Sequence, residues 1–427
     1  MDFLQQHPAE QIAAIMRRIY ERGLTTASGG NISILNENGD LWITPKAVDK
    51  GGLTAADMIC VHPDNTAEGI HSVSSELPFH RAAYRARPDA RAVLHAHPVY
   101  CIAYSLTRTL PRVDLLPETE RFCRNQRLAK YAMTGSRLLG EHLYSEFSKG
   151  ADVVFLENHG VCVAGSNLLE AYQRFELMEY AAQLELLAKK LGAPRGLSRE
   201  QLALAAKRAP LDELETACAD ALEQNARAEL IQIIRRAYAQ KLFTGAQGAF
   251  SVRLNEGAFL ISPDGLDNAE MCAEDLILLR KGKAERGKSP SALFALHAAL
   301  YERQPAVNAV CSAQPASVMA FAATNAKFET YTIPESFLML REVPKYAFEE
   351  PYLNPETAAT RFSSQTPVVL FENNCIVTTG ESPFQAFDRL EVAEATASSI
   401  LFAREAGEVV LLSEAEILEL KTTFHIE

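Results

Sequence analysis

The feature that most constrains the fold of this chain is an internal repeat. Four segments of the first half return in the same order in the second half. The pairs are EQIAAIMRRIYERGLTTASGGNISIL and AELIQIIRRAYAQKLFTGAQGAFSVRL, LWITPKAVDKGGLTAADMICV and FLISPDGLDNAEMCAEDLILL, RPDARAVLHAHP and RQPAVNAVCSAQP, and VVFLENHGVCVAG and VVLFENNCIVTTG. Four ordered matches predict two copies of one domain in tandem.

The repeat divides the 427 residues into three parts. We assign residues 1–192 to a first domain, 193–224 to a helical linker and 225–427 to a second domain. Gly192, Pro194 and Gly196 interrupt a long helix that begins near Ser166. After it, LSREQLALAAKRA and LDELETACADALEQ are typical of short amphipathic linker helices.

Each copy mixes helical and strand patterns. The first copy opens with apolar residues at helical spacing, namely Ile12, Ile15, Met16 and Ile19. Further along we predict a helix over 76–87, strands over 92–97 and 153–158, and a long closing helix. Short strands flanked by helices favour an α/β/α layered domain.

Composition excludes several classes of protein. The net charge of -12 comes without a basic block, which argues against nucleic-acid binding. No apolar stretch approaches the roughly 18 to 20 residues of a membrane span. The N-terminus lacks the basic and apolar segments of a signal peptide, so we expect a cytoplasmic protein. The eight scattered cysteines form no C-x-x-C pair, predict reduced thiols and do not indicate a thiolate metal site.

Three histidines and one glutamate are candidate site residues. His95 and His97 alternate along a predicted strand, so both point to one face and can hold one metal ion. Two imidazoles suit zinc, and His159, directly after another strand, would complete a site with one open position. Each residue also has a simpler explanation. His95 and His97 would be unrelated histidines on a solvent-exposed strand face, and His159 would be a capping or turn residue. Glu76 would compensate the dipole of the helix that it begins.

The second copy serves as an internal control for these candidates. The residues opposite His95, His97, His159 and Glu76 are Ser312, Gln314, Asn374 and Leu293. Scaffold residues persist, as with His80 and His297. Four potential ligands lost together indicate one shared metal site, so we predict one zinc per chain, in the first domain.

A second group of residues fits an anion. Gly30, beside Gly29, lets backbone N–H groups approach a phosphate, and Asn31 adds a side-chain donor. Ser74 and Ser75 offer two hydroxyls. A tight helix-to-strand turn is the alternative for the glycine pair.

Taken in order, Gly-Asn-Ile-Ser, Ile-Thr-Pro, Ser-Ser-Glu, His-Ala-His and Asn-His-Gly resemble the motifs of the class II aldolase/adducin family. That family includes L-fuculose-1-phosphate aldolase and L-ribulose-5-phosphate 4-epimerase. The resemblance covers the first domain to about Tyr180 with all its motifs, and the second domain at scaffold positions only.

The resemblance implies a three-layer α/β/α sandwich around a mainly antiparallel sheet. It implies zinc held by His95, His97 and His159, with Glu76 as proton shuttle. It also implies phosphate binding by Gly30, Asn31, Ser74 and Ser75. The chain departs from the family's Ile-Thr-Pro-x-Gly, since Lys46 and Ala47 follow Pro45, and the charge of Lys46 would compensate for the missing glycine. The aldolase tyrosine has no match, which leaves the proton donor at the aldehyde end unassigned.

The predicted function is retro-aldol cleavage of a small ketose phosphate by a metal-dependent carbon–carbon lyase. An epimerase, decarboxylase or dehydratase with the same zinc site is the alternative. A non-catalytic adducin-like binding protein is a further alternative, which the second domain fits by itself. Family members form rings with sites between subunits, so we predict a homodimer that closes a four-domain ring.

Overall fold

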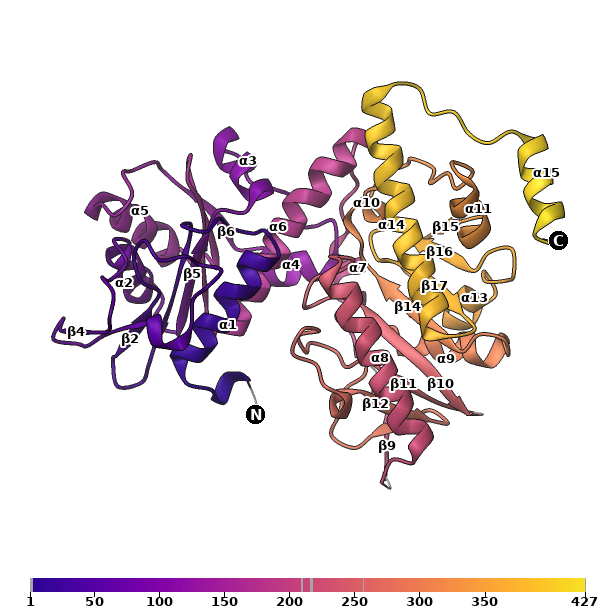
Figure 1. Ribbon diagram of the computed structural model, residues 1–427, viewed down its shortest axis with the longest axis horizontal. Helices are drawn as coiled ribbons and strands as arrows, with labels where there is room; N and C mark the ends of the chain where they lie inside the picture. The colour runs from indigo at the N-terminus through magenta and orange to yellow at the C-terminus, as the bar shows by residue number, and fades with distance from the viewer. Residues whose placement is uncertain (1–2, 209, 216–217, 256, 427) are drawn as a thin grey trace. The chain divides into compact units, whose positions relative to one another are not determined.

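The computed structural model describes residues 3–208, 210–215, 218–255 and 257–426 (Figure 1). The chain forms two compact units. Unit 1 contains the residues up to Val113 together with Thr119–Gln183, and unit 2 contains Asp114–Glu118 and the residues from Leu184 onward. The division of the sequence at residues 192 and 225 stays a prediction.

Unit 1 is built on an eight-stranded sheet with the order β4-β3-β2-β1-β5-β8-β7-β6. All neighbours are antiparallel except β6 and β7. The strands are β1 (Asn31–Leu35), β2 (Leu41–Ile43), β3 (Ile59–Val61), β4 (Ala67–Glu68), β5 (Ala92–Ala96), β6 (Gln126–Ala129), β7 (Val153–Leu156) and β8 (Gly160–Gly165). The mainly antiparallel sheet is as predicted.

Helices lie on both faces of this sheet, which makes three layers. On one face α2 and α5 pack against apolar strand residues such as Ile43, Ile59 and Val154. On the other, the predicted apolar stripe of α1 is buried. The helical segments are η1 (Phe3–Gln5), α1 (Pro8–Glu21), η2 (Ala55–Asp57), α2 (Leu77–Ala86), α3 (Val99–Thr107), α4 (Pro117–Cys123), α5 (Arg137–Ser148) and α6 (Leu168–Leu191).

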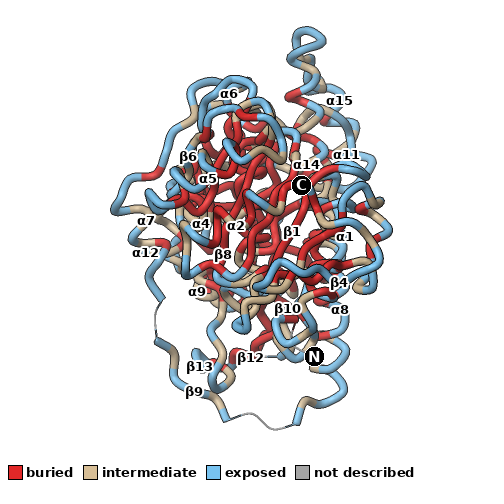
Figure 2. The backbone as a smooth tube through the Cα atoms, turned by 90° about the vertical axis from the view of Figure 1, so that its left-hand side faces the viewer, coloured by how far each residue is buried: buried red, intermediate tan, exposed pale blue. Residues whose placement is uncertain are grey.

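Unit 2 repeats this plan with a nine-stranded sheet of order β15-β16-β17-β14-β10-β11-β12-β13-β9. Its strands are β9 (Asp212–Leu214), β10 (Ala249–Asn255), β11 (Ala258–Ile261), β12 (Ile277–Arg280), β13 (Lys283–Glu285), β14 (Ala309–Ala313), β15 (Lys345–Tyr346), β16 (Val368–Phe371) and β17 (Cys375–Gly380). Figure 2 shows the buried residues along the inner segments of the chain, with exposed residues along the outer loops.

The helical segments of unit 2 cover its sheet and include part of the predicted linker. They are α7 (Arg199–Ala205), α8 (Ala221–Ala239), η3 (Ala273–Asp275), α9 (Phe294–Arg303), α10 (Ala316–Ala322), α11 (Pro334–Leu340), α12 (Glu350–Leu353), α13 (Pro355–Ala359), α14 (Pro383–Ala406) and α15 (Glu414–Thr423). Among the described residues, no helix is long and apolar enough to cross a membrane.

The prediction of a second linker helix over LDELETACADALEQ was wrong in its first part. Residues 212–214 form β9, which pairs in parallel with β13. A helix begins only at Ala221, where the Asp220 carboxylate accepts a hydrogen bond from the N–H of Glu223 (2.8 Å). That helix continues into the opening helix of the second copy, so linker and repeat share α8. Residues 216–217 lie outside the described part.

Candidate functional site

The candidate metal ligands meet at one end of the unit 1 sheet. His95 lies near the end of β5 and His97 directly after it. His159 lies in the turn between β7 and β8, and β8 pairs with β5 so that His95 stands opposite Cys162. Chain segments more than 60 residues apart in sequence therefore deliver three imidazoles to one place.

The three rings face one another closely. The Nε2 atoms of His95 and His97 are 3.1 Å apart. Ring centroids lie 4.7 Å apart for His95 and His159 and 5.2 Å apart for His97 and His159. One ligand nitrogen from each ring can be chosen so that all lie within 4.8 Å of one another. Nitrogens about 3.3 Å apart fit a tetrahedral zinc with Zn–N distances near 2.0 to 2.1 Å.

The environment keeps these imidazoles neutral, as metal ligands must be. Burial lowers the pKa of His97 and of His159, and it lowers the pKa of fully buried His95 well below its usual value. His95 Nδ1 donates to the Val161 carbonyl (3.0 Å), which leaves Nε2 as an acceptor. His159 Nδ1 is buried without a hydrogen-bond partner among the described residues. An orphaned ring nitrogen beside two neutral imidazoles fits a zinc ion.

Two glycines make room for the His97 ring. A Cβ at Gly160 would lie 2.8 Å from His97 Cδ2 and 2.6 Å from the Ala96 carbonyl oxygen. A Cβ at Gly29 would lie 2.9 Å from His97 Nδ1 and equally close to the Thr25 hydroxyl. In the sequence, Gly29 was singled out only as the neighbour of Gly30. Nothing in the sequence indicated that Gly160 must lack a side chain.

Glu76 is positioned beside the histidines by the start of α2. Its Oε2 lies 3.6 Å from His95 Nε2, and its Oε1 lies 3.7 Å from His159 Nε2. Burial raises the pKa of Glu76, while a hydrogen bond from Asn31 and the neighbouring His159 oppose that rise. Because Glu76 is the N-cap residue of α2 yet makes no side-chain cap bond, its carboxylate is available to the pocket.

Asn31 holds that carboxylate from behind. Its Nδ2 donates to Glu76 Oε2 at 2.6 Å, and its Oδ1 pairs with His80 Nε2. His80 Nδ1 in turn contacts the Ser33 hydroxyl (2.7 Å), which contacts the Tyr84 hydroxyl (2.8 Å). Since Asn31 donates to Glu76 with its amide nitrogen, its oxygen accepts from His80. The structure thus shows Asn31 positioning Glu76, a part that the sequence did not suggest.

The other predicted anion-binding residues are distributed around this cluster. Gly30 has φ +76°, and a Cβ there would lie 2.8 Å from the His95 carbonyl oxygen. The buried Ser74 accepts a hydrogen bond at Oγ from the Glu76 N–H (3.3 Å). Lys46 and Ser75 are exposed, and no described hydrogen bond or ion pair joins their side chains to the histidines. The loop of Lys46 lies beside the loop of Ser75, because the Lys46 N–H donates to the Ser72 carbonyl (2.9 Å).

Lys50 is a residue that sequence reasoning missed. It is buried, and its ammonium group donates to the Pro45 carbonyl (2.8 Å). Its backbone N–H donates to the Ala27 carbonyl (2.8 Å), which ties together two loops predicted to bind an anion. Burial lowers the pKa of Lys50. Nothing in its sequence context distinguishes it from an ordinary surface lysine.

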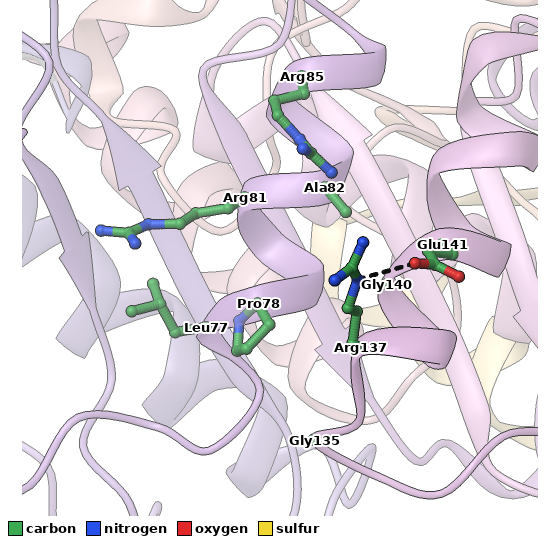
Figure 3. A pocket seen from close by; sticks show the side chains of 9 residues that line it. All are labelled: Leu77, Pro78, Arg81, Ala82, Arg85, Gly135, Arg137, Gly140 and Glu141. Atoms are coloured by element: carbon green, nitrogen blue, oxygen red, sulfur yellow. Dashed lines mark hydrogen bonds and ion pairs between the residues drawn. The ribbon is translucent and has the colours of Figure 1, made fainter. Parts of the chain in front are cut away.

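A surface pocket described on unit 1 lies elsewhere. This pocket of about 640 Å³ lies between α2 and α5 (Figure 3), lined by Leu77, Pro78, Arg81, Ala82, Arg85, Gly135, Arg137, Gly140 and Glu141. Arg137 is paired with Glu141 (2.9 Å), as the dashed line shows. None of the predicted site residues lines this pocket, so the chemistry is assigned to the histidine cluster.

Comparisons with known proteins agree with the repeat. Residues 10–186 and 228–401 match the model of the class II aldolase and adducin N-terminal domain. L-fuculose phosphate aldolase of Methanococcus maripaludis is 35% identical over 178 residues, 42% of this chain and 95% of that protein. 5-deoxy-D-ribulose 1-phosphate aldolase of Bacillus thuringiensis is 32% identical over 208 residues, 48% of this chain and 96% of that protein.

A solved structure of L-fuculose 1-phosphate aldolase is 27% identical, with a TM-score of 0.43, and covers 48% of this chain and 97% of its own. The two matched segments are the two copies of the repeat, and together they account for most of the chain. The chain is therefore a member of the class II aldolase and adducin family, with the family's domain present twice.

Proposed function

We propose that the chain is a zinc-dependent aldolase that cleaves a small sugar phosphate, such as a ketose 1-phosphate. The observation that carries the proposal is the convergence of three neutral imidazoles and one buried carboxylate in unit 1. The two similar aldolases carry the names of sugar phosphates as their substrates, which supports the same substrate class here.

His95, His97 and His159 would hold the zinc. A bound zinc ion would supply a Lewis acid that polarises a carbonyl group and stabilises the negative charge that develops there. Retro-aldol cleavage breaks the bond between the α and β carbons of that ketone. The β-hydroxyl gives up its proton as the β carbon leaves as an aldehyde, and the α carbon remains as an enediolate carbon that needs a proton.

Glu76 is the group placed to move that proton. Its carboxylate lies less than 4 Å from two of the imidazoles, and burial raises its pKa, so it can carry a proton closer to neutral pH than an exposed glutamate can. Asn31 fixes one carboxylate oxygen (2.6 Å), which keeps the other directed toward the His159 side.

Residues on the surrounding loops would bind the phosphate. Gly30, Ser74, Ser75 and Lys46 offer backbone N–H groups, hydroxyls and one cation on neighbouring loops. One amide hydrogen of Asn31 binds Glu76 in this arrangement. Asn31 would therefore bind the phosphate with its other amide hydrogen.

The proposal is tested by metal analysis combined with a product screen. Zinc-loaded protein is incubated with a panel of ketose 1-phosphates, and aldehyde release is measured, with His95→Ala as the control. Aldehyde release that depends on His95 supports the proposal. A zinc-loaded protein that yields only an epimer, carbon dioxide or a dehydrated product instead would replace the aldolase by an epimerase, decarboxylase or dehydratase. A protein that binds no zinc and converts no substrate would favour the adducin-like alternative.

A further inference from the structure

A second group of metal-binding side chains lies at the far edge of the unit 1 sheet. Leu41, Ile43, Ile59 and Val61 face the core beneath α2 and α5. Because strand side chains alternate, Asp40, Cys60 and His62 share the opposite face of β2 and β3 and their ends. Glu68, on β4, stands directly opposite Cys60. In the sheet order, β1 lies between this group and β5 with its histidines.

Three donor atoms of this group converge. His62 Nδ1 lies 2.7 Å from Asp40 Oδ1 and 4.0 Å from Cys60 Sγ. All the candidate ligand atoms of Asp40, Cys60 and His62 lie within 4.8 Å of one another. With Zn–S near 2.3 Å and Zn–N near 2.0 to 2.1 Å, sulfur and nitrogen on a tetrahedral ion are about 3.5 Å apart. A shift of roughly half an ångström by Cys60 and a similar opening of the His62–Asp40 pair would admit the ion.

The donors are also supported from behind, as metal ligands usually are. His62 Nε2 lies 3.3 Å from Glu68 Oε1, so the ring nitrogen turned away from Cys60 faces a carboxylate. Asp40 Oδ2 accepts a hydrogen bond from Asn38 Nδ2 (2.7 Å), which leaves Oδ1 directed at the group. Two of the three donors are therefore oriented by a partner.

We propose that Asp40, Cys60 and His62 form a second metal site, which takes zinc or a similar thiolate-binding divalent ion. One thiolate, one imidazole and one carboxylate suit zinc, whereas magnesium and calcium prefer oxygen ligands throughout. The fourth position is left to water. This proposal departs from the sequence analysis, which did not indicate a thiolate metal site, and with it the expected total becomes two ions per chain instead of one.

The repeat again supplies an internal control. The residues opposite Asp40, Cys60 and His62 in the second copy are Ala258, Leu278 and Arg280. The core residue directly before Cys60 is kept, since Ile59 corresponds to Ile277 and both are buried. All three donors are thus absent together from a strand pair that otherwise has the same architecture.

An ordinary ion pair between His62 and Asp40 is the competing explanation. Pairing of a protonated His62 with both Asp40 and Glu68 accounts for the two carboxylate contacts, but not for the Cys60 thiol beside the same imidazole. A metal site accounts for all four side chains.

Cobalt distinguishes this site from the one proposed for catalysis. The full-length protein is stripped with a chelator and titrated with Co²⁺. A cobalt ion bound to a thiolate gives a near-ultraviolet charge-transfer band, which an all-histidine site cannot give. We expect the band in the wild-type protein and in His95→Ala, and its loss in Cys60→Ser. Cys272→Ser is the matched control, because Cys272 also contacts a carboxylate (3.0 Å, Asp275) but has no imidazole beside it, and it should keep the band.

Zinc counts give a second readout. We expect two ions per chain in the wild type, one in His95→Ala, one in Cys60→Ser and none in the double variant. If Cys60→Ser fails to fold, His62→Gln replaces it and should also lose one ion. A wild-type protein without the band, or a band that survives Cys60→Ser, would overturn the site. Neither result bears on the three-histidine centre, whose failure would appear as a zinc count unchanged by His95→Ala.

Discussion

The replacement Glu76→Gln tests the proposed proton shuttle most directly. Glutamine has nearly the same shape as glutamate, and its side-chain oxygen can still accept the hydrogen bond from Asn31 that is 2.6 Å long in the wild type. The variant removes the charge and the ability to exchange a proton, and it leaves the three histidines untouched.

The structure predicts a small effect on folding and a large effect on rate. A hydrogen bond to a charged group stabilises by about 1.5 to 3 kcal/mol, and a neutral one by about 0.5 to 1.5 kcal/mol. This loss is offset because the variant no longer buries a charge, a cost that is visible in the raised pKa of Glu76. We therefore expect the free energy of unfolding to change by no more than about 1 kcal/mol. Loss of a positioned acid/base lowers kcat by roughly two to four orders of magnitude, about 3 to 5 kcal/mol in the barrier.

The assay measures kcat on a substrate found in the product screen, together with zinc content and a denaturation curve. The control is Glu141→Gln, an exposed glutamate paired with Arg137, which should leave all three unchanged. A Glu76→Gln variant with full zinc and near-native kcat would refute the proton-shuttle role. A variant that loses its zinc would instead make Glu76 a ligand.

Further predictions concern the metal, the sterics of the site, the pH dependence of stability and the assembly. His95→Ala should lose both activity and one zinc ion, measured by elemental analysis. Gly160→Ala should weaken zinc binding and lower the free energy of unfolding by about 1 to 3 kcal/mol, because its Cβ would lie 2.6 Å from a carbonyl oxygen. A Cβ at Gly407 would meet open space, so the control Gly407→Ala should change neither quantity. Burial raises the pKa of Glu394 to about 7, above its value in the unfolded chain. The free energy of unfolding should therefore fall as pH rises from about 4.5 to 7. Denaturation curves of Glu394→Gln should show a flatter dependence on pH. Light scattering should find a homodimer, the assembly that we predict from the tandem duplication, and a monomer with full activity would contradict it.

Much of the site was predictable because its signals are local. The spacing of His95 and His97 requires only that the segment be a strand, and the repeat showed which polar residues change together. The predicted helix over 76–87 and the strand over 153–158 are confirmed as α2 (Leu77–Ala86) and β7 (Val153–Leu156), each within two residues at either end. Amphipathic and buried patterns were sufficient there.

The parts that escaped prediction depend on register and on distant partners. Asn31 reaches Glu76 because β1 pairs with β5 so that Asn31 stands opposite His95, and no local pattern specifies that register. The strand at residues 212–214 exists because β13, about seventy residues later, offers it an edge, so a short amphipathic segment became a strand rather than a helix. Lys50 is buried for the same kind of reason, since two loops close over it.

The second copy also shows which polar residues are scaffold and which are chemistry. Its buried His297 contacts the Ser251 hydroxyl (2.7 Å), which contacts the Tyr301 hydroxyl (2.7 Å), as His80, Ser33 and Tyr84 do in unit 1. Burial lowers the pKa of both His80 and His297 to about 3, so neither carries charge near neutral pH. Because this group of residues persists where the candidate metal ligands are absent, we interpret it as a structural support.

The structural support and the candidate site are linked through the second ring nitrogen, Nε2, of His80 and His297. In unit 1, His80 Nε2 pairs with Asn31, and in unit 2 the corresponding position is Ala249, which offers no side-chain acceptor. His297 Nε2 instead pairs with the Ser312 hydroxyl (2.8 Å), and Ser312 occupies the position of His95. A buried imidazole nitrogen left unpaired costs about 1 to 3 kcal/mol. The Asn31-to-Ala249 and His95-to-Ser312 differences between the copies therefore compensate each other, because the Ser312 hydroxyl supplies the partner for His297 that Asn31 supplies for His80.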